Sequence, residues 1–222
     1  MTVRVVAIDG PAGSGKSTVA RAVADALGLP TLDTGAMYRA VTLAALRAGV
    51  DLADADAVAT VARHAAVVVD DARVTVDGDD VTTEIRGPVV TAAVSEVSAH
   101  PSVRTVLVER QREWAREHGG GVVEGRDIGT VVFPDAPVKV FLTASDAVRA
   151  ARRQRDEVAA ARAVGVDDVR DSIAARDRAD GTLGRATRPE HAASDALVLH
   201  TDDLSVDEAV ARIVAACAEL PA

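Results

Sequence analysis

A glycine-rich loop near the start of the chain constrains its fold more than any other feature. Residues 10–17 read Gly-Pro-Ala-Gly-Ser-Gly-Lys-Ser, which fits G-x-x-x-x-G-K-[ST] and directly follows the apolar run from Val3 to Ile8. A strand, a glycine loop and a helix in this order cradle phosphate, because successive backbone N–H groups and the helix N-terminus all face the anion. The loop therefore predicts an α/β fold with a phosphate-binding site.

Two side chains of this loop carry chemistry of their own. Lys16 supplies a mobile positive charge, and Ser17 is placed to ligate Mg²⁺ beside a bound phosphate. Lys16 and Lys139 are the only lysines among the 25 basic residues, so a lysine at this position by accident would be unusual. The pattern is therefore read as a functional loop and not as a plain glycine turn.

Composition narrows the class of protein. With 222 residues, 48% of them hydrophobic, the chain can bury one sizeable core, with or without inserts. A net charge of -9 and only four aromatic residues argue against binding a nucleic-acid polymer or an anionic membrane. The single cysteine, Cys217, excludes an internal disulfide, and no signal peptide or long apolar run is found. We therefore expect a cytoplasmic protein.

The rest of the chain alternates between apolar runs and segments of helical periodicity, which is typical of a parallel sheet flanked by helices. Strands are expected at 3–8, 31–33, 121–124, 138–142 and 196–199. Helices are expected at 16–27, 36–48, 54–65, 101–118, 145–163, 167–179 and 205–218. Ser205 and Glu208 form a predicted capping box for the last helix.

One region breaks this alternation. Residues 66–69 and 73–82 read as short antiparallel strands with an Asp77-Gly78 turn. The sequence therefore predicts a three-layer α/β fold around a five-stranded parallel sheet, with a small antiparallel insert and a helical lid.

Two segments that follow predicted strands are candidates for a second ligand site, because ligands of α/β folds bind at the carboxyl edge of the sheet. Residues 33–39 place Thr34 and Arg39 there, and residues 124–130 place Arg126 and Asp127 there. An Arg fork can hold a phosphate, and a neighbouring Asp can accept from the amino group of a base. A capped helix with a surface Arg, or an Arg–Asp pair in a turn, would explain the same residues.

A third candidate is the arginine-rich stretch after residue 148. It comprises Arg149, Arg152, Arg153, Arg155, Arg162, Arg176, Arg178 and Arg185. Phosphoryl transfer spreads negative charge over the transferred oxygens, so arginines that close over the donor would form a sensible lid. A solvated helix face explains most of these residues equally well.

Taken together, these motifs resemble those of the bacterial cytidylate kinase family, enzymes that transfer the γ-phosphate of ATP to CMP or dCMP. The matching segments are 8–11, the glycine loop, 32–39, 84–86, 125–134 and 176–178. The run Gly-Arg-Asp-Ile-Gly-Thr-Val-Val-Phe-Pro at 125–134 is far more specific than the loop. The match spans nearly the whole chain and weakens in its last third.

The resemblance implies a division into three parts and a set of site residues. Residues 1–59, 101–148 and 166–222 would form the core, 60–100 the monophosphate-binding insert, and 149–165 the lid. ATP would be bound by Gly10, Pro11, Ala12, Gly13, Ser14, Gly15, Lys16, Ser17 and Thr18. CMP would be bound by Thr34, Arg39, Ser95, Arg104, Arg126, Asp127, Arg176 and Asp180. Catalysis would fall to Lys16, Arg126, Arg176 and Arg185, with Mg²⁺ on Ser17, in a monomer.

Within this set, Arg39 and Arg126 would hold the acceptor phosphate, while Ser95, Arg104 and Asp127 would contact the cytosine. The acceptor phosphate is already ionised at neutral pH, so no general base is required. The five histidines are scattered without metal-ligand spacing and read as structural or exposed.

The chain departs from the family pattern after Asp180, where the spacing to the next arginine is about two residues longer. Arg185 is the preferred contact for the transferred phosphate, and Arg188 is the alternative. Two rival functions stay open: another small P-loop kinase, for example of shikimate or gluconate, and a nucleotide-binding switch without catalysis. The guanine-reading motif Asn-Lys-x-Asp is absent from the sequence.

Overall fold

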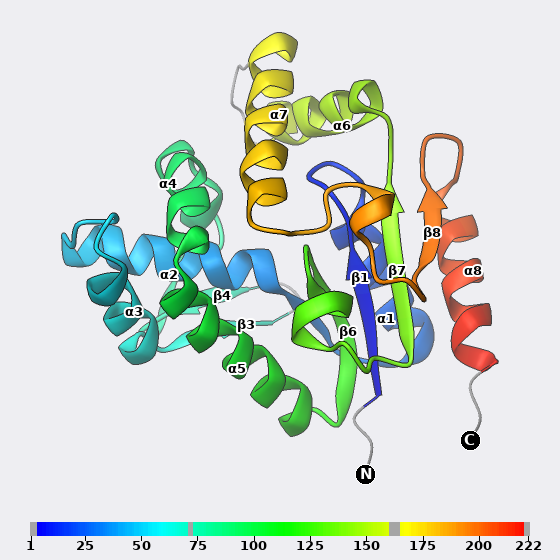
Figure 1. Cartoon of the computed structure of the whole chain (residues 1–222), viewed down its shortest axis with the longest axis horizontal. Coiled ribbons are helices and arrows are strands. Elements are labelled where there is room, and N and C mark those ends of the chain that lie inside the picture. Colours follow the sequence, from blue (N-terminus) through cyan, green and yellow to red (C-terminus); the bar gives the residue numbers. More distant parts are fainter. Residues whose placement is uncertain (1–3, 71–72, 160–164, 220–222) are drawn as a thin grey trace.

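The computed structural model describes residues 4–70, 73–159 and 165–219, and its centre is a five-stranded sheet (Figure 1). The strand order is β2-β6-β1-β7-β8, and every pairing is parallel. The bounds are β1 (Arg4–Asp9), β2 (Thr31–Asp33), β6 (Gly120–Gly125), β7 (Val138–Thr143) and β8 (Leu197–His200). The predicted five-stranded parallel sheet is confirmed.

Alternating side chains of the strands feed two separate cores, because successive residues of a strand point to opposite faces. Val6 and Ile8 pack with α1 (Lys16–Leu27) and α8 (Val206–Ala218) on one face. Val5 and Ala7 pack with α2 (Thr34–Ala48) and α5 (Pro101–Glu117) on the other. The sheet is thus covered on both faces, which explains why its strands read as apolar runs.

The insert stands to one side of the main sheet (Figure 1). The range predicted for it, residues 60–100, contains the end of α3 (Ala55–His64), all of α4 (Pro88–Ala99) and a three-stranded antiparallel sheet of β3 (Val67–Val69), β4 (Val74–Val76) and β5 (Asp79–Asp80). Asp77 and Gly78 have φ values of 52° and 91°, as the tight turn between β4 and β5 requires. The predicted antiparallel strands and their Asp-Gly turn are confirmed.

Helix α4 was absent from the predicted helix ranges. Its sequence PVVTAAVSEVSA is rich in valine, which lowers helix propensity. Pro88 occupies its first turn, where a missing N–H costs nothing, and Val90, Val94 and Val97 are buried. Packing of this apolar face therefore overrides the weak intrinsic preference.

Helices α6 (Asp146–Ala159) and α7 (Val166–Thr182) pack on each other beyond the carboxyl edge of the sheet (Figure 1). The sequence predicted helices at 145–163 and 167–179, so α7 is one turn longer than expected. Residues 160–164, including the predicted end of the first helix and Arg162, lie outside the described residues. The predicted lid, residues 149–165, overlaps α6, whereas α7 falls in the range predicted as core.

The capping box of α8 is confirmed, since the Ser205 hydroxyl accepts from the Glu208 backbone N–H while the Glu208 carboxylate accepts from Ser205. Among the described helices, none is long and apolar enough to span a bilayer.

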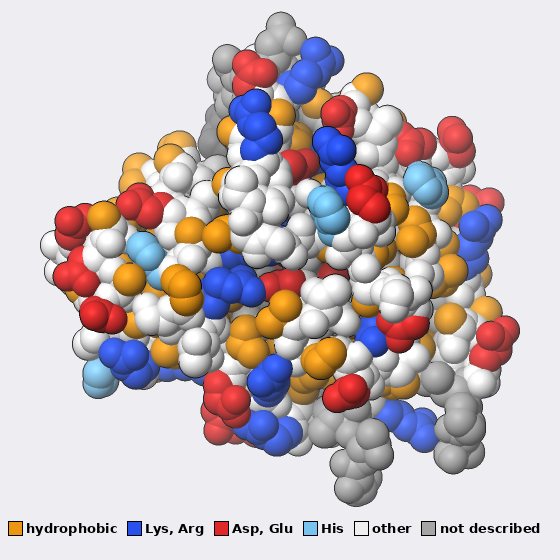
Figure 2. Space-filling view, viewed as in Figure 1, with side chains coloured by type: hydrophobic (Ala, Val, Ile, Leu, Met, Phe, Trp, Pro, Cys, Tyr) orange, Lys and Arg blue, Asp and Glu red, His pale blue; other side chains and the backbone are white. Residues whose placement is uncertain are grey.

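The molecular surface carries charges of both signs. Positively and negatively charged side chains are interspersed over the face shown in Figure 2.

Candidate active site

The glycine loop lies at the carboxyl end of β1 and adopts a conformation that needs glycine. Gly10, Gly13 and Gly15 have φ values of 151°, 76° and 94°. A Cβ at Gly10 would lie 2.1 Å from the Leu142 carbonyl oxygen, so a side chain is excluded there. Gly15 caps α1 without a side-chain hydrogen bond, which leaves the first N–H groups of this described helix available to an anion.

Lys16 folds back over this loop. Its Nζ donates to the Pro11 carbonyl oxygen at 2.9 Å, and the residue is buried. Burial, followed by the nearby positive charge of Arg126, lowers the pKa of Lys16. A bound phosphate would relieve both effects by placing a negative charge beside the ammonium group.

Ser17 lies beside a carboxylate that the sequence analysis did not assign. Its Oγ donates to Oε1 of Glu124, the penultimate residue of β6, at 2.5 Å. Burial, followed by the negative charge of Asp33, raises the pKa of the Glu124 carboxyl. The pair brings a hydroxyl and a carboxylate oxygen together at the start of α1, which is the oxygen chemistry that Mg²⁺ favours.

Asp9 holds the segment that follows β6 against the end of β1. Its two carboxylate oxygens accept the backbone N–H groups of Ile128 and Gly129 at 2.7 and 2.8 Å. Burial raises the pKa of Asp9 to about 6 although these N–H groups favour the charged form. The contact fixes the segment that carries Arg126 and Asp127 beside the glycine loop, over a separation of about 120 residues.

Three arginines, Arg39 on α2, Arg126 after β6 and Arg176 on α7, lie near one another close to the glycine loop. Arg126 Nη1 pairs with Asp180 at 2.9 Å, and Arg39 Nη1 donates to the Ile85 carbonyl at 3.0 Å and the Thr91 hydroxyl at 2.9 Å. The pKa of Arg176 falls to about 9 because of burial, and then because of Arg126 and Arg39. Crowded, desolvated guanidinium groups of this kind would be stabilised by an anion among them.

Thr34 and the Arg104–Asp127 pair border the same cluster. The Thr34 hydroxyl donates to the Glu124 carbonyl oxygen at 2.7 Å at the start of α2, which begins two residues before its predicted position. Arg104 on α5 forms a short salt bridge with Asp127, and Asp127 is buried. The structure thus brings the predicted base-contacting Arg and Asp together.

Arg185 and Arg188, the two alternatives of the sequence analysis, lie in very different surroundings. Arg185 is buried, pairs with Asp180 at 2.6 Å, and donates to the hydroxyl and carbonyl oxygens of Ser98 on α4. The side chain of Arg188 is 74% exposed and its ion pair among the described residues is with Glu190, at 3.9 Å. Ser95, one turn before Ser98, accepts from the Ser98 hydroxyl through its carbonyl oxygen at 3.1 Å.

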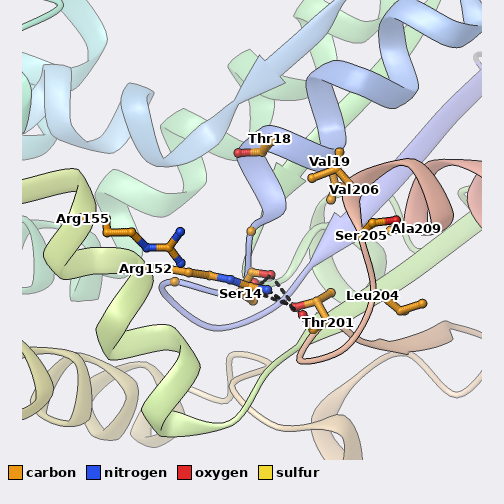
Figure 3. Close-up of a pocket in the computed structure, with 12 residues that line it drawn as sticks. Ser14, Thr18, Val19, Arg152, Arg155, Thr201, Leu204, Ser205, Val206 and Ala209 are labelled. Carbon is orange, nitrogen blue, oxygen red and sulfur yellow. Dashed lines mark hydrogen bonds between the residues drawn. The ribbon is translucent and has the colours of Figure 1, made fainter. Parts of the chain in front are cut away.

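A cavity of about 280 Å³ opens on the other side of the glycine loop (Figure 3). Arg152 spans one wall, since its Nη1 donates to the Ser14 carbonyl at 3.2 Å and to the Thr201 hydroxyl at 2.8 Å. Leu204 and Val206, at the start of α8, contribute apolar surface. The sequence analysis missed these residues after β8, although their place at the carboxyl edge of the sheet was a usable signal.

A glycine loop at the carboxyl edge of a parallel sheet, with arginines near it from α2, the segment after β6 and α7, defines the class of P-loop kinases. Comparison of the sequence with models of known protein families identifies the family more specifically. A family model for cytidylate kinase matches residues 6–219. The chain belongs to the cytidylate kinase family.

Individual relatives agree with this assignment. The chain is 56% identical over 205 residues to the cytidylate kinase of Mycobacterium avium (strain 104), covering 90% of this chain and 89% of that one. It is 50% identical over 214 residues to the cytidylate kinase of Mycobacterium leprae (strain Br4923), covering 96% and 95%. The kinase family that the sequence motifs indicated is therefore confirmed.

Solved structures support the fold alone, because their sequence identity is low. An uncharacterized protein from Eubacterium ventriosum ATCC 27560 has a TM-score of 0.57 at 13% identity and covers 98% of this chain, with 99% of its own length matched. TT1252 from Thermus thermophilus has a TM-score of 0.50 at 22% identity, covering 99% and 98%.

Proposed function

We propose that the protein transfers the γ-phosphate of ATP to CMP or dCMP by in-line displacement, giving ADP and CDP or dCDP. One observation carries the assignment of this chemistry to particular residues. The glycine loop around Lys16, the Arg39–Arg126–Arg176 cluster and the Arg104–Asp127 pair lie along one edge of a single sheet. Two phosphate-binding sites and a polar site for a base are thereby combined.

The donor binds through the glycine loop. The backbone of residues 10–18 receives its phosphates, Lys16 neutralises them, and the cavity beside Arg152 and Thr201 receives its nucleoside. Arg152 is held in that cavity by carbonyl and hydroxyl acceptors, so its planar group can lie against a base without being freely mobile.

The acceptor phosphate binds between Arg39 and Arg126, and Arg176 beside them contacts the ribose side of the acceptor. These groups are desolvated in the free protein, so a dianionic phosphate gains charge-assisted hydrogen bonds that water cannot match. Arg185 approaches from the end of α7 to contact the transferred phosphoryl group.

The cytosine binds against Asp127, Arg104 and Ser95. Cytosine presents an amino donor where uracil presents an acceptor, so an ionised Asp127 favours the former. A base of the wrong pattern would leave buried polar groups without partners. Thr34 and Asp180 contact the nucleotide on its phosphate and sugar side.

Mg²⁺ fits the residues at the start of α1. The Ser17 hydroxyl and the Glu124 carboxylate supply oxygen donors within 2.5 Å of each other, and Mg²⁺ in kinases takes few protein ligands besides phosphates and water. The ion, when bound, neutralises charge on the donor phosphates. Among the described residues, no group of three or more acidic, histidine or cysteine side chains forms an all-protein cage.

Catalysis then depends on position and charge. The acceptor oxygen is already ionised, so the chain has only to align two anions and offset their repulsion with Lys16, Arg126, Arg176 and Arg185. The division into core, insert (60–100) and lid (149–165), a monomeric state and a cytoplasmic location complete the proposal; they rest on the sequence and the family resemblance.

The test is ADP release from Mg-ATP in the presence of CMP, dCMP, UMP, AMP, GMP or shikimate, with Lys16→Ala as the blank. Turnover restricted to CMP and dCMP supports both the reaction and the base contacts. Turnover on another acceptor would overturn the roles of Ser95, Arg104 and Asp127 in base recognition, whereas the assignment of kinase activity would stand. ATP binding without any turnover would favour the nucleotide-switch alternative.

A further inference from the structure

A chain of charged side chains connects the glycine loop to the acceptor arginines. It begins at Arg149 on α6, whose side chain is 8% exposed. Arg149 Nη1 donates to the Ala12 carbonyl oxygen of the loop at 3.1 Å and to Oδ2 of Asp177 at 2.5 Å. A side chain of the lid thus holds the loop backbone with the same nitrogen that holds a carboxylate of α7.

Asp177 continues the chain with its other oxygen. Oδ1 accepts from Nη1 of Arg126 at 3.3 Å, and both side chains are largely buried, at 15% and 13% exposed. One carboxylate therefore touches an arginine fixed to the donor loop and an arginine placed for the acceptor phosphate. Its Oδ2 contacts Arg149 and its Oδ1 contacts Arg126.

The contact between α6 and the loop is also steric. A Cβ built at Gly13 would lie 2.8 Å from the backbone carbonyl oxygen of Arg149 and 3.1 Å from its Cα. The tip of the glycine loop therefore fits directly against the α6 backbone. A displacement of α6 would change the space available to the loop, and the reverse also holds.

Asp180, the other carboxylate near Arg126, differs in this respect. It pairs with Arg126 at 2.9 Å and with Arg185 at 2.6 Å, and both arginines face the acceptor. Among the described residues, Asp177 is the carboxylate that bridges Arg149 and Arg126. Asp177 therefore gives α7 a direct ion-paired link between the arginine that contacts the glycine loop and Arg126.

We propose that Asp177 is a positioning residue that couples occupancy of the donor loop to the affinity of the acceptor site, by holding Arg149 against Ala12 and Arg126 toward the acceptor phosphate. Asp177 itself contacts neither substrate. When the donor orders the loop, Arg149 is fixed, Asp177 is fixed with it, and Arg126 is presented to the acceptor in one orientation. This inference rests on the proposed function.

The test compares Asp177→Asn with Asp146→Asn. Asp146 is a matched control, because it also accepts from Arg149, at 2.5 Å, yet its side chain is 84% exposed and, among the described residues, it forms no ion pair with Arg126. The dissociation constant of CMP is measured by calorimetry with and without saturating Mg-β,γ-methylene-ATP, and kcat and KM are measured for both substrates.

We expect the ATP analogue to tighten CMP binding at least about fivefold in the unchanged protein and in Asp146→Asn. In Asp177→Asn this factor should fall to about two or less, and kcat should fall about tenfold while CMP affinity without the analogue changes little. A purely structural role would instead lower thermal stability and leave the coupling factor intact, which would overturn the proposal.

The remaining outcomes are also decisive. If the two variants behave alike, or if the unchanged protein binds CMP without any coupling, the inference fails while the proposed function stands. If the unchanged protein does not bind CMP at all, the proposed function fails. Should Asp177→Asn not fold, Arg149→Lys replaces it, because an ammonium group cannot reach Ala12 and Asp177 with the geometry of the planar fork. Retained coupling in that variant would overturn the proposal.

Discussion

Arg104 and Asp127 form a salt bridge that joins α5 to the segment following β6. Asp127 is buried, whereas Arg104 is partly exposed, so the carboxylate is held at a defined place beside the acceptor cluster. Because each group satisfies the other, the pair can stay charged in the free protein and exchange partners when a base arrives.

Asp127→Ala should lower kcat/KM for CMP by about 10²-fold while the affinity for ATP changes little, since a charge-assisted hydrogen bond to a buried group contributes about 1.5–3 kcal/mol and Arg104 is left without its partner. Steady-state kinetics and ATP-analogue binding measure the two effects separately. Equal losses in both, or none in either, would exclude Asp127 from base recognition.

Lys16→Ala should reduce kcat by about 10²–10³-fold, because the ammonium group that neutralises the transferred phosphate is removed. The chain offers a natural control in Lys139, the only other lysine, which pairs with the exposed Asp195 at 2.8 Å. Lys139→Gln should retain nearly full activity, because glutamine keeps most of the apolar stem of this largely buried side chain and gives up the ion pair with Asp195. Comparable losses in both variants would point to general destabilisation.

Glu124→Gln should raise the Mg²⁺ concentration needed for half-maximal activity by about 10–100-fold, because it removes a charged oxygen beside the Ser17 hydroxyl. The measurement is a Mg²⁺ titration of the initial rate at saturating substrates. Glu109→Gln is the control, since Glu109 forms only an exposed pair with Arg116 at 2.8 Å. An unchanged titration in Glu124→Gln would remove Glu124 from the metal site.

Arg185→Ala should lower kcat by about 10²-fold, whereas Arg188→Ala should have no measurable effect. The expectation follows from the buried contacts of Arg185 with Asp180 and Ser98, against the exposed position of Arg188. Single-turnover rates with CMP separate an effect on chemistry from one on product release. A larger loss in Arg188→Ala would reverse the assignment.

The raised pKa of Asp9 predicts a pH dependence of stability. A carboxyl that titrates near 6 in the folded protein and near its ordinary value in the unfolded chain binds its proton more tightly when folded. Its contribution to stability is therefore present below about pH 4 and is lost as the pH rises through 6. The free energy of unfolding relative to Asp9→Asn should fall by on the order of 2–3 kcal/mol between pH 4 and pH 7.

Chemical denaturation of both proteins at several pH values measures this difference. Asp9→Asn should be the less stable of the two at pH 4, because its amide can accept only one of the two backbone N–H groups. Asp195→Asn, at an exposed site, serves as the control for general pH effects. A difference that does not vary with pH would show that Asp9 titrates in its ordinary range.

The sheet, most helices and the glycine loop were predictable because their signals are local. Gly13, which adopts a φ of 76°, belongs to the eight-residue glycine-loop pattern, so it can be recognised from the sequence alone. The capping box of Ser205 and Glu208 can be recognised in the same way, from a spacing of three residues. Helix α4 was not predicted because its valines have a low intrinsic helix propensity, and the tertiary packing that stabilises the helix cannot be read from the local sequence.

The contacts that organise the candidate site were not predictable, because they join residues far apart in the chain. Asp9 reaches Gly129, Ser17 reaches Glu124 and Arg149 reaches Ala12, and no spacing rule connects such pairs. The family resemblance supplied individual candidate residues, whereas the partners that hold them came only from the three-dimensional arrangement.

The position of β1 between β6 and β7 has a consequence for biosynthesis. β1 leaves the ribosome well before both of its neighbours in the sheet, which begin at residues 120 and 138. The Ser14 carbonyl also accepts from the Thr201 hydroxyl at 3.1 Å. The glycine loop is therefore synthesised long before the residue that completes its contacts, so a nascent chain stalled before residue 201 would lack the Thr201 hydrogen bond to the loop.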